Sequence, residues 1–230
     1  NVYLPYLYYG DNVNLLLIRH GETNANLEMK WSGYNDLPFT NLTANGKEQA
    51  RKLCDWFQKN NIQPTHIYSS PQIRARETCL IATNPWNLPI HLSNDLRETN
   101  PGIFEGLSWK EIEKKYPYQS AAFFNSRDWD YVDGSESDLN RLKRGKNIIK
   151  FLINTHSNND TIFIFSHGGT IKQLIAAILE TKKIWNVSPK NTSLFEFIFD
   201  KDNWYEESNI IYHPLKWKIL KFNDTPHLNN

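Results

Sequence analysis

The chain has 230 residues, of which 40% are hydrophobic, and a formal net charge of +1 at pH 7; this suits one large α/β domain and argues against the basic surface of a nucleic-acid-binding protein. No apolar run approaches the roughly 20 residues that a membrane span requires, and residues 1–10 lack the features of a signal peptide. Cys54 and Cys79 are too few for a disulfide framework or a zinc site, so we expect a cytoplasmic protein with no nucleic-acid or membrane partner.

Strand and helix patterns alternate along the chain. In chain order they predict a strand over 15–18, a helix over 47–58, a strand over 66–69, a helix over 71–82, helices over 108–116, 120–124 and 138–156, a strand over 161–165, a helix over 170–179, and late strands over 194–199 and 217–222. We expect Thr43 to cap the helix over 47–58, and Ser70 with Pro71 to open the helix over 71–82. Residues 161–165 are continuously apolar, as in a strand buried on both faces.

This alternation predicts a mainly parallel sheet covered by helices on both sides. Neither a repeat nor a linker divides the sequence, so residues 1–230 are expected to form a single domain. The strand over 194–199 could pair across a homodimer or form the edge of a monomeric sheet, and the pattern alone does not distinguish the two.

Chemically useful side chains follow three of the predicted strands. His20 comes after the first strand, Arg74 lies in the first turn after the second, and His167 follows the strand over 161–165. In an open parallel sheet, ligands bind at the carboxyl ends of the strands, where helix N-termini also favour anions. Taken one at a time, each residue has an ordinary structural explanation. Together with Arg19, they predict a phosphate site that needs no metal.

Six segments in order carry a resemblance to the histidine phosphatase superfamily, whose members are phosphoglycerate-mutase-like proteins. They are residues 17–23 (LIRHGET, with Asn26 beyond), 69–78 (SSPQIRARET), 96–98 with 104–107 (LRE and FEGL), 134–137 (GSES), 166–169 (SHGG) and 223–228 (NDTPHL). The resemblance implies a three-layer α/β/α sandwich with a mainly parallel sheet, and a small cap region at about residues 99–133.

Roles also follow from the resemblance. It implies that His20 is the nucleophile, phosphorylated during turnover, and that Glu98 is the proton donor, although Glu22 or Glu105 could stand in its place. The remaining residues would hold the phosphoryl group: His167, Arg19, Arg74, Asn26 and Gly168. An imidazole attacks phosphorus only through an unprotonated nitrogen, so the other nitrogen of His20 should donate to a backbone carbonyl near Gly21.

A phosphatase and a mutase share such a site. The interval from Glu98 to His167 is only 69 positions, and residues 120–133 offer one arginine, Arg127, where a mutase has a pair. Both features favour hydrolysis of a small phosphorylated metabolite without a cofactor. The alternative is a phosphoglycerate mutase, which would need 2,3-bisphosphoglycerate. It is favoured by residues 31–36, which resemble the mutase form of that loop, while extra residues near 39–41 match neither pattern. A catalytically silent scaffold is a third possibility, disfavoured because the whole residue set is present.

Aromatic residues are frequent in the expected cap. They could cover a bound metabolite or simply pack the cap itself, and the second explanation is the simpler one. They are Phe104, Trp109, Tyr116, Tyr118, Phe123, Phe124, Trp129 and Tyr131.

Overall fold

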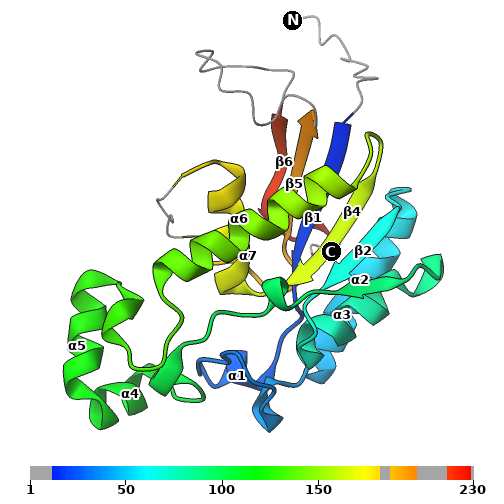
Figure 1. The fold of residues 1–230 in the computed structure, drawn as a ribbon. Coiled ribbons are helices and arrows are strands. Elements are labelled where there is room, and N and C mark those ends of the chain that lie inside the picture. The colour runs from blue at the N-terminus through cyan, green and yellow to red at the C-terminus, as the bar shows by residue number, and fades with distance from the viewer. Residues whose placement is uncertain (1–11, 182–186, 201–216, 229–230) are drawn as a thin grey trace, which may run out of the picture.

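One six-stranded sheet organises the molecule in the computed structural model, which describes residues 12–181, 187–200 and 217–228 (Figure 1). The strand order is β3-β2-β4-β1-β5-β6. The first four strands in this order are parallel, and β5 and β6 run antiparallel to their neighbours. The strands are β1 (Asn12–Arg19), β2 (His66–Ser69), β3 (Ile90–Leu92), β4 (Thr161–Ser166), β5 (Leu194–Asp200) and β6 (Trp217–Asp224).

Helices cover both faces of this sheet. Helices α2 and α3 pack on one face, and α6 and α7 on the other (Figure 1). The predicted three-layer α/β/α sandwich is therefore confirmed. The helices are α1 (Asn24–Leu27), α2 (Ala44–Lys59), α3 (Ile73–Thr83), α4 (Trp109–Lys115), α5 (Pro117–Ser126), α6 (Asp138–Thr155) and α7 (Gly168–Ile178).

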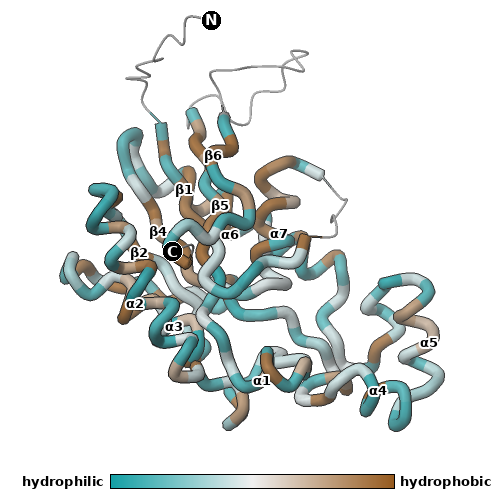
Figure 2. The backbone as a smooth tube through the Cα atoms, turned by 180° about the vertical axis from the view of Figure 1, so that it is seen from behind, coloured by the Kyte–Doolittle hydropathy of each residue, from teal (hydrophilic) through white to brown (hydrophobic). Residues whose placement is uncertain are grey.

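The central position of β1 in the sheet explains why its residues 15–18 are wholly apolar. Leu15 and Leu17 join the core beneath α6 and α7, whereas Leu16 and Ile18 join the core beneath α2 and α3. Each of these side chains is almost fully buried, which stabilises the fold by about 1.5–3 kcal/mol per residue. Figure 2 shows the same concentration of apolar residues along the central strands and α7.

Helices α4 and α5 lie apart from the two helix layers, beside α1 (Figures 1 and 2). They have a small core of their own, in which Phe104, Phe123 and Trp129 are buried. Most of the aromatic residues in this region therefore pack against one another, as the simpler explanation required. Tyr118, Phe124 and Tyr131 are exposed.

Two local predictions were wrong. Helix α3 begins at Ile73, two residues later than expected, because Gln72 is its N-cap in an extended conformation. Strand β5 pairs with β1 on one side and β6 on the other, so it has no free edge for a dimer. By contrast, Thr43 caps α2 as predicted, with its hydroxyl accepting from the Gly46 N–H at 2.9 Å. Among the described helices, none combines the length and apolar character needed to cross a membrane.

Candidate active site

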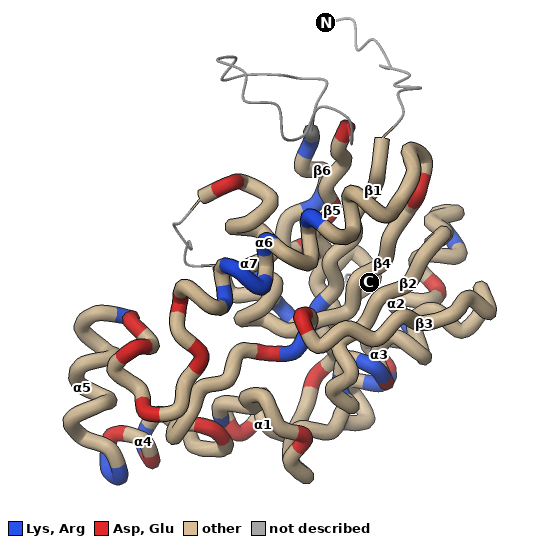
Figure 3. The backbone as a smooth tube through the Cα atoms, in the orientation of Figure 1, with Lys and Arg blue, Asp and Glu red and all other residues tan. Residues whose placement is uncertain are grey.

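Three neighbouring parallel strands, β2, β4 and β1, deliver the candidate residues to one edge of the sheet. Backbone hydrogen bonds continue past the strand ends: the His20 N–H donates to the Ser166 carbonyl at 3.0 Å, and the Ser70 N–H donates to the Phe165 carbonyl at 2.9 Å. Charged positions of both signs lie close together at this end of the sheet (Figure 3). The strand ladder thus fixes the chain segments on which the site is built.

The two histidines of the pattern, His20 and His167, are neighbours. Their ring centroids lie 5.2 Å apart and both side chains are buried. The Nδ1 of His20 lies 2.7 Å from the Gly21 carbonyl, so the predicted hydrogen bond is present. With the proton on Nδ1, the lone pair of Nε2 is available for attack. Burial, together with the charges of Arg19 and Arg74, lowers the pKa of His20 well below 6.5.

His167 has one nitrogen paired and one not. Its Nε2 lies 2.8 Å from the Ser70 hydroxyl, while its buried Nδ1 has no hydrogen-bond partner within the described chain. Burial, Arg74 and the neighbouring His20 lower the pKa of His167 well below 6.5. If Ser70 donates to Nε2, the neutral ring carries its proton on Nδ1 and can donate it to an anion.

Arg74 is fully buried. Its Nη2 donates to the Gly33 carbonyl at 2.9 Å, and Asp36 lies 4.0 Å from Nη1. Its Nε and Nη1 find no hydrogen-bond acceptor in the part of the chain that the structure describes. Burial lowers the pKa of Arg74 to about 10, against the opposing effect of Glu98 and Asp36. A buried guanidinium with unsatisfied N–H groups favours an anion beside it.

Arg19 lies at the end of β1 and is half-buried. Its Nη1 donates to the Pro189 carbonyl at 2.5 Å, and its Nε is buried with no acceptor among the described residues. Burial lowers the pKa of Arg19, and the charge of Glu98 opposes this. Arg19 and Arg74 therefore each have a buried N–H group without an acceptor among the described residues, and both lie near enough to His20 for their charges to lower its pKa.

The side chain of Glu98, a loop residue, contacts the N-terminus of helix α7. Its Oε2 accepts from the Gly169 N–H at 3.0 Å, and its Oε1 accepts from the N–H groups of Thr170 at 3.1 Å and Thr99 at 2.8 Å. A carboxylate is well placed there because a helix N-terminus has unpaired N–H groups. The carboxylate is thus anchored close to Arg19 and Arg74, and its negative charge raises the pKa of both guanidinium groups. The charge of Glu98 also raises the pKa of Lys172 on α7, against the effect of burial. The sequence motifs did not indicate this lysine.

Asn26 and Gly168 lie at the rim. The Oδ1 of Asn26 accepts from the Thr23 N–H at 3.1 Å and from the amide of Asn191 at 3.0 Å. Asn191 also donates to the His20 carbonyl at 3.1 Å, and so links Asn26 to the segment that carries His20. Gly168 is the first residue of α7, and a Cβ placed there would lie 3.6 Å from Arg19 Nε.

The two alternative acids, Glu22 and Glu105, are engaged elsewhere. Glu22 accepts from the Thr43 hydroxyl at 2.7 Å and from the Asn45 amide at 3.1 Å, at the start of α2. Glu105 accepts from the backbone and side-chain amides of Asn35 at 2.7 and 2.6 Å. Glu22 therefore supports the start of α2, and Glu105 supports the loop at Asn35 while its charge raises the pKa of Arg74. Glu98 instead contacts α7, the helix that begins at the site.

Gln72 is a positioning residue that sequence reasoning missed. Its Nε2 donates to the carbonyls of Gly33 at 3.1 Å and Tyr34 at 3.0 Å, and its Oε1 accepts from the Glu98 N–H at 2.7 Å. Gly33 has φ +67°, and a Cβ there would lie 2.2 Å from Glu105 Oε1, so the position favours glycine. The sequence feature that could have indicated Gln72 is its place inside residues 69–78, a segment that resembles the family.

Arg144 holds the segment before Glu98. Its guanidinium donates to both carboxylate oxygens of Glu136 at 2.9 and 2.8 Å, and to the carbonyls of Asp95 at 2.7 Å and Arg97 at 2.8 Å. Glu136, from the GSES segment, thus acts through an ion pair with Arg144. No feature of the sequence around Arg144 indicated this contact.

The extra residues near 39–41 form part of a short 3-10 turn, Pro38–Thr40. The Phe39 ring lies close to Gly106, and the Lys30 ammonium lies 5.4 Å from the ring centroid. The turn therefore packs against the segment between Glu105 and α4, the first part of the expected cap.

Known proteins resemble the chain in sequence and in structure. It is 30% identical over 197 residues to the phosphoglycerate mutase-like protein 4 of Arabidopsis thaliana, covering 84% of this chain and 83% of that protein. It is 27% identical over 201 residues to a metal-independent phosphoserine phosphatase of the same plant, covering 85% and 82%. The crystal structure of a phosphoserine phosphatase from Entamoeba histolytica in complex with 3-phosphoglyceric acid superposes with a TM-score of 0.74 at 28% identity, covering 94% of this chain and 99% of that one.

The match to a family model is as broad as these resemblances, since it extends over residues 15–210. Together with the shared fold, it shows that the chain belongs to the histidine phosphatase superfamily, branch 1.

Proposed function

We propose that the protein is a phosphomonoesterase that hydrolyses a small phosphorylated metabolite through a phosphohistidine on His20, without a metal. The observation that carries this is the pair of buried imidazoles, 5.2 Å apart, beside guanidinium N–H groups with no partner in the described residues. Guanidinium groups supply the positive charge that a metal would otherwise bring to phosphate. The metal-independent relative supports the same conclusion.

In the first step, Nε2 of His20 forms a bond to phosphorus as the ester P–O bond breaks. Arg19, Arg74 and His167 donate hydrogen bonds to the equatorial oxygens, where negative charge spreads in the transition state. Asn26 and the N–H of Gly168 add donors at the rim. Glu98 gives a proton to the leaving oxygen, so the alcohol departs neutral.

In the second step, water attacks the phosphohistidine. Glu98, now ionised, accepts a proton from that water as its oxygen bonds to phosphorus and the N–P bond breaks. Phosphate leaves, His20 regains its lone pair and Glu98 is again protonated. The cycle returns every group to its starting state, which is consistent with catalysis that needs no cofactor.

The relatives named above include phosphoserine phosphatases, which favours a small phosphorylated acid or similar metabolite. We treat the chain as one catalytic domain in which residues 99–133 act as a cap over the substrate. Two free, buried cysteines, Cys54 and Cys79, agree with a reducing compartment such as the cytoplasm.

The proposal is tested with para-nitrophenyl phosphate in the presence of a chelator. We expect turnover that is lost in His20→Ala and kept in His91→Ala, a change at an exposed histidine outside the site, with folding checked by circular dichroism. Absence of turnover with any phosphoester would instead indicate a silent scaffold. Supplying 3-phosphoglycerate with catalytic 2,3-bisphosphoglycerate tests the mutase alternative, because rapid formation of 2-phosphoglycerate without release of phosphate would contradict hydrolysis.

A further inference from the structure

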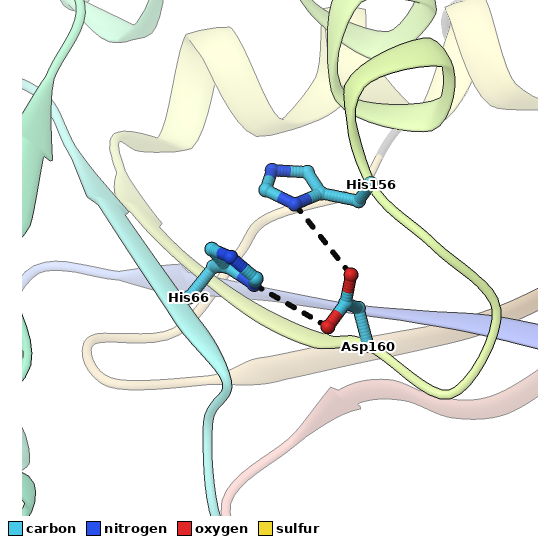
Figure 4. A group of neighbouring side chains, drawn as sticks. All are labelled: His66, His156 and Asp160. Atoms are coloured by element: carbon cyan, nitrogen blue, oxygen red, sulfur yellow. Dashed lines mark ion pairs between the residues drawn. The ribbon is translucent and has the colours of Figure 1, made fainter.

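A second group of histidines lies at the opposite end of the sheet. His66 begins β2, His156 follows the last residue of α6, and Asp160 immediately precedes β4. Their side chains point toward one another (Figure 4). Strand β4 leads from Asp160 to His167, so the group is separated from the candidate active site by roughly 20 Å.

The donor atoms of these three residues lie slightly farther apart than the ligand atoms of an occupied metal site. The Nδ1 of His66 lies 3.5 Å from one oxygen of Asp160, and the Nδ1 of His156 lies 3.8 Å from the other. One candidate atom from each residue lies within 4.8 Å of the others. Zinc bonds of about 2.0–2.1 Å in tetrahedral geometry place ligand atoms about 3.4 Å apart. A small inward movement of the three side chains would therefore close the site around an ion.

Neighbouring groups orient these side chains. The Tyr68 hydroxyl lies 2.9 Å from Nε2 of His156, and when Nε2–H donates to it, the Nδ1 lone pair faces Asp160. The Ser157 N–H donates to Asp160 at 2.8 Å. Metal-binding imidazoles and carboxylates are held in this way by a second layer of hydrogen bonds.

The Thr65 hydroxyl contacts both His66 and Asp160, between which an ion would bind. Its hydroxyl lies 2.9 Å from His66 Nδ1 and 2.9 Å from Asp160 Oδ1. An ion bound to His66 Nδ1 would replace the contact between Thr65 and His66. The Thr65 hydroxyl would keep its contacts with Asp160 and with the Thr161 carbonyl, 3.2 Å away. The side chains of His66 and Asp160 are 36% and 18% exposed, so an ion can enter from solvent.

We propose that His66, His156 and Asp160 bind one divalent transition-metal ion of the zinc class, with water completing the coordination. Two neutral imidazoles and one carboxylate give a site of charge −1, and imidazole ligands select zinc, copper or nickel over magnesium or calcium. The bound ion would tie the start of β2 to the connection between α6 and β4. The proposal is independent of the phosphatase chemistry, because the sites share no residue.

The test uses the full chain prepared without a histidine tag, treated with chelator and then desalted. Titration with Co²⁺ should give one equivalent of visible d–d absorption, and Zn²⁺ should displace it. We expect His66→Ala and Asp160→Asn to weaken binding by more than about 10-fold, with the far-ultraviolet circular dichroism of the parent.

His91→Ala is the matched control. This exposed histidine stacks on Tyr68 with ring centroids 5.1 Å apart but is not one of the three ligands, so binding should persist in that variant. Hydrolysis of para-nitrophenyl phosphate should be unchanged in His66→Ala. The proposal is overturned if the parent protein binds neither ion, if His66→Ala and Asp160→Asn bind as tightly as the parent, or if His91→Ala loses binding to the same extent.

Discussion

Adding one methyl group at Gly169 should separate proton delivery from phosphate binding. A Cβ at this position would lie 2.5 Å from Glu98 Oε1 and 3.0 Å from the Thr99 hydroxyl. Ordinary contact begins at 3.4 Å, so in Gly169→Ala the carboxylate must retreat by roughly 1 Å. The Gly169 N–H donates to Glu98 at 3.0 Å, and this displacement takes the pair beyond hydrogen-bonding range.

The expected loss depends on the leaving group. A misplacement of about 1 Å costs about 100-fold, so we expect kcat/KM for an alkyl phosphate such as phosphoserine to fall by about that factor. Hydrolysis of para-nitrophenyl phosphate, whose leaving group needs little protonation, should fall far less. The lost charged hydrogen bond costs about 1.5–3 kcal/mol of stability, partly offset by about 1 kcal/mol of helix propensity, so the variant should still fold.

Gly168→Ala is the comparison for this experiment. Its added methyl meets Arg19 at 3.6 Å, an ordinary contact, and any effect should be similar for both substrates because it acts on the phosphate pocket. Equal losses for the two substrates in Gly169→Ala would refute the assignment of Glu98 as the proton donor.

Three further predictions concern histidines. Ser70→Ala removes the partner of His167 Nε2, and kcat should fall by less than the roughly 100-fold that loss of a direct oxyanion donor costs; unchanged kinetics would exclude a positioning role. Because burial and two arginines lower the pKa of His20 below 6.5, kcat/KM should persist as the pH falls past 6.5, and an acid limb at or above that value in a pH–rate profile would contradict this. His227, whose Nε2 lies 2.8 Å from the Thr192 hydroxyl, has its pKa lowered by burial to about 4. The unfolded chain takes up a proton below pH 6.5 that the folded chain does not, so stability should fall from pH 6.5 to about 4 by at most about 3 kcal/mol; urea unfolding should show a flatter pH dependence in His227→Gln.

The layered fold was predictable because burial on both sheet faces leaves a direct mark on the sequence. Residues 15–18 and 162–165 are wholly apolar, and the structure gives each strand a helix layer on both faces. The position of β5 was not predictable, because strand pairing depends on partners distant in sequence. Its neighbours are β1, which lies some 180 residues earlier, and β6.

Within the site, the motifs identified the groups expected to touch phosphate but not the groups that hold them. His20, Arg74 and His167 lie in short, recognisable segments. The hydrogen bond between Ser70 and His167 spans 97 residues, and the bond from Asn191 to His20 spans 171. Such contacts arise only when loops meet in space. The start of α3 was misplaced for the same reason, since Gln72 is held by Gly33 and Glu98 from outside the helix.

Gln72 has a consequence for how the enzyme could diversify. One amide group fastens the loop at Gly33 and Tyr34 and also the backbone of Glu98. On the proposal that Glu98 is the proton donor, a substitution that reshapes this loop will therefore shift that acid as well. Selection for new substrates and selection for fast turnover act on the same side chain, so a variant with altered preference should need a compensating change near residue 72 before it regains speed.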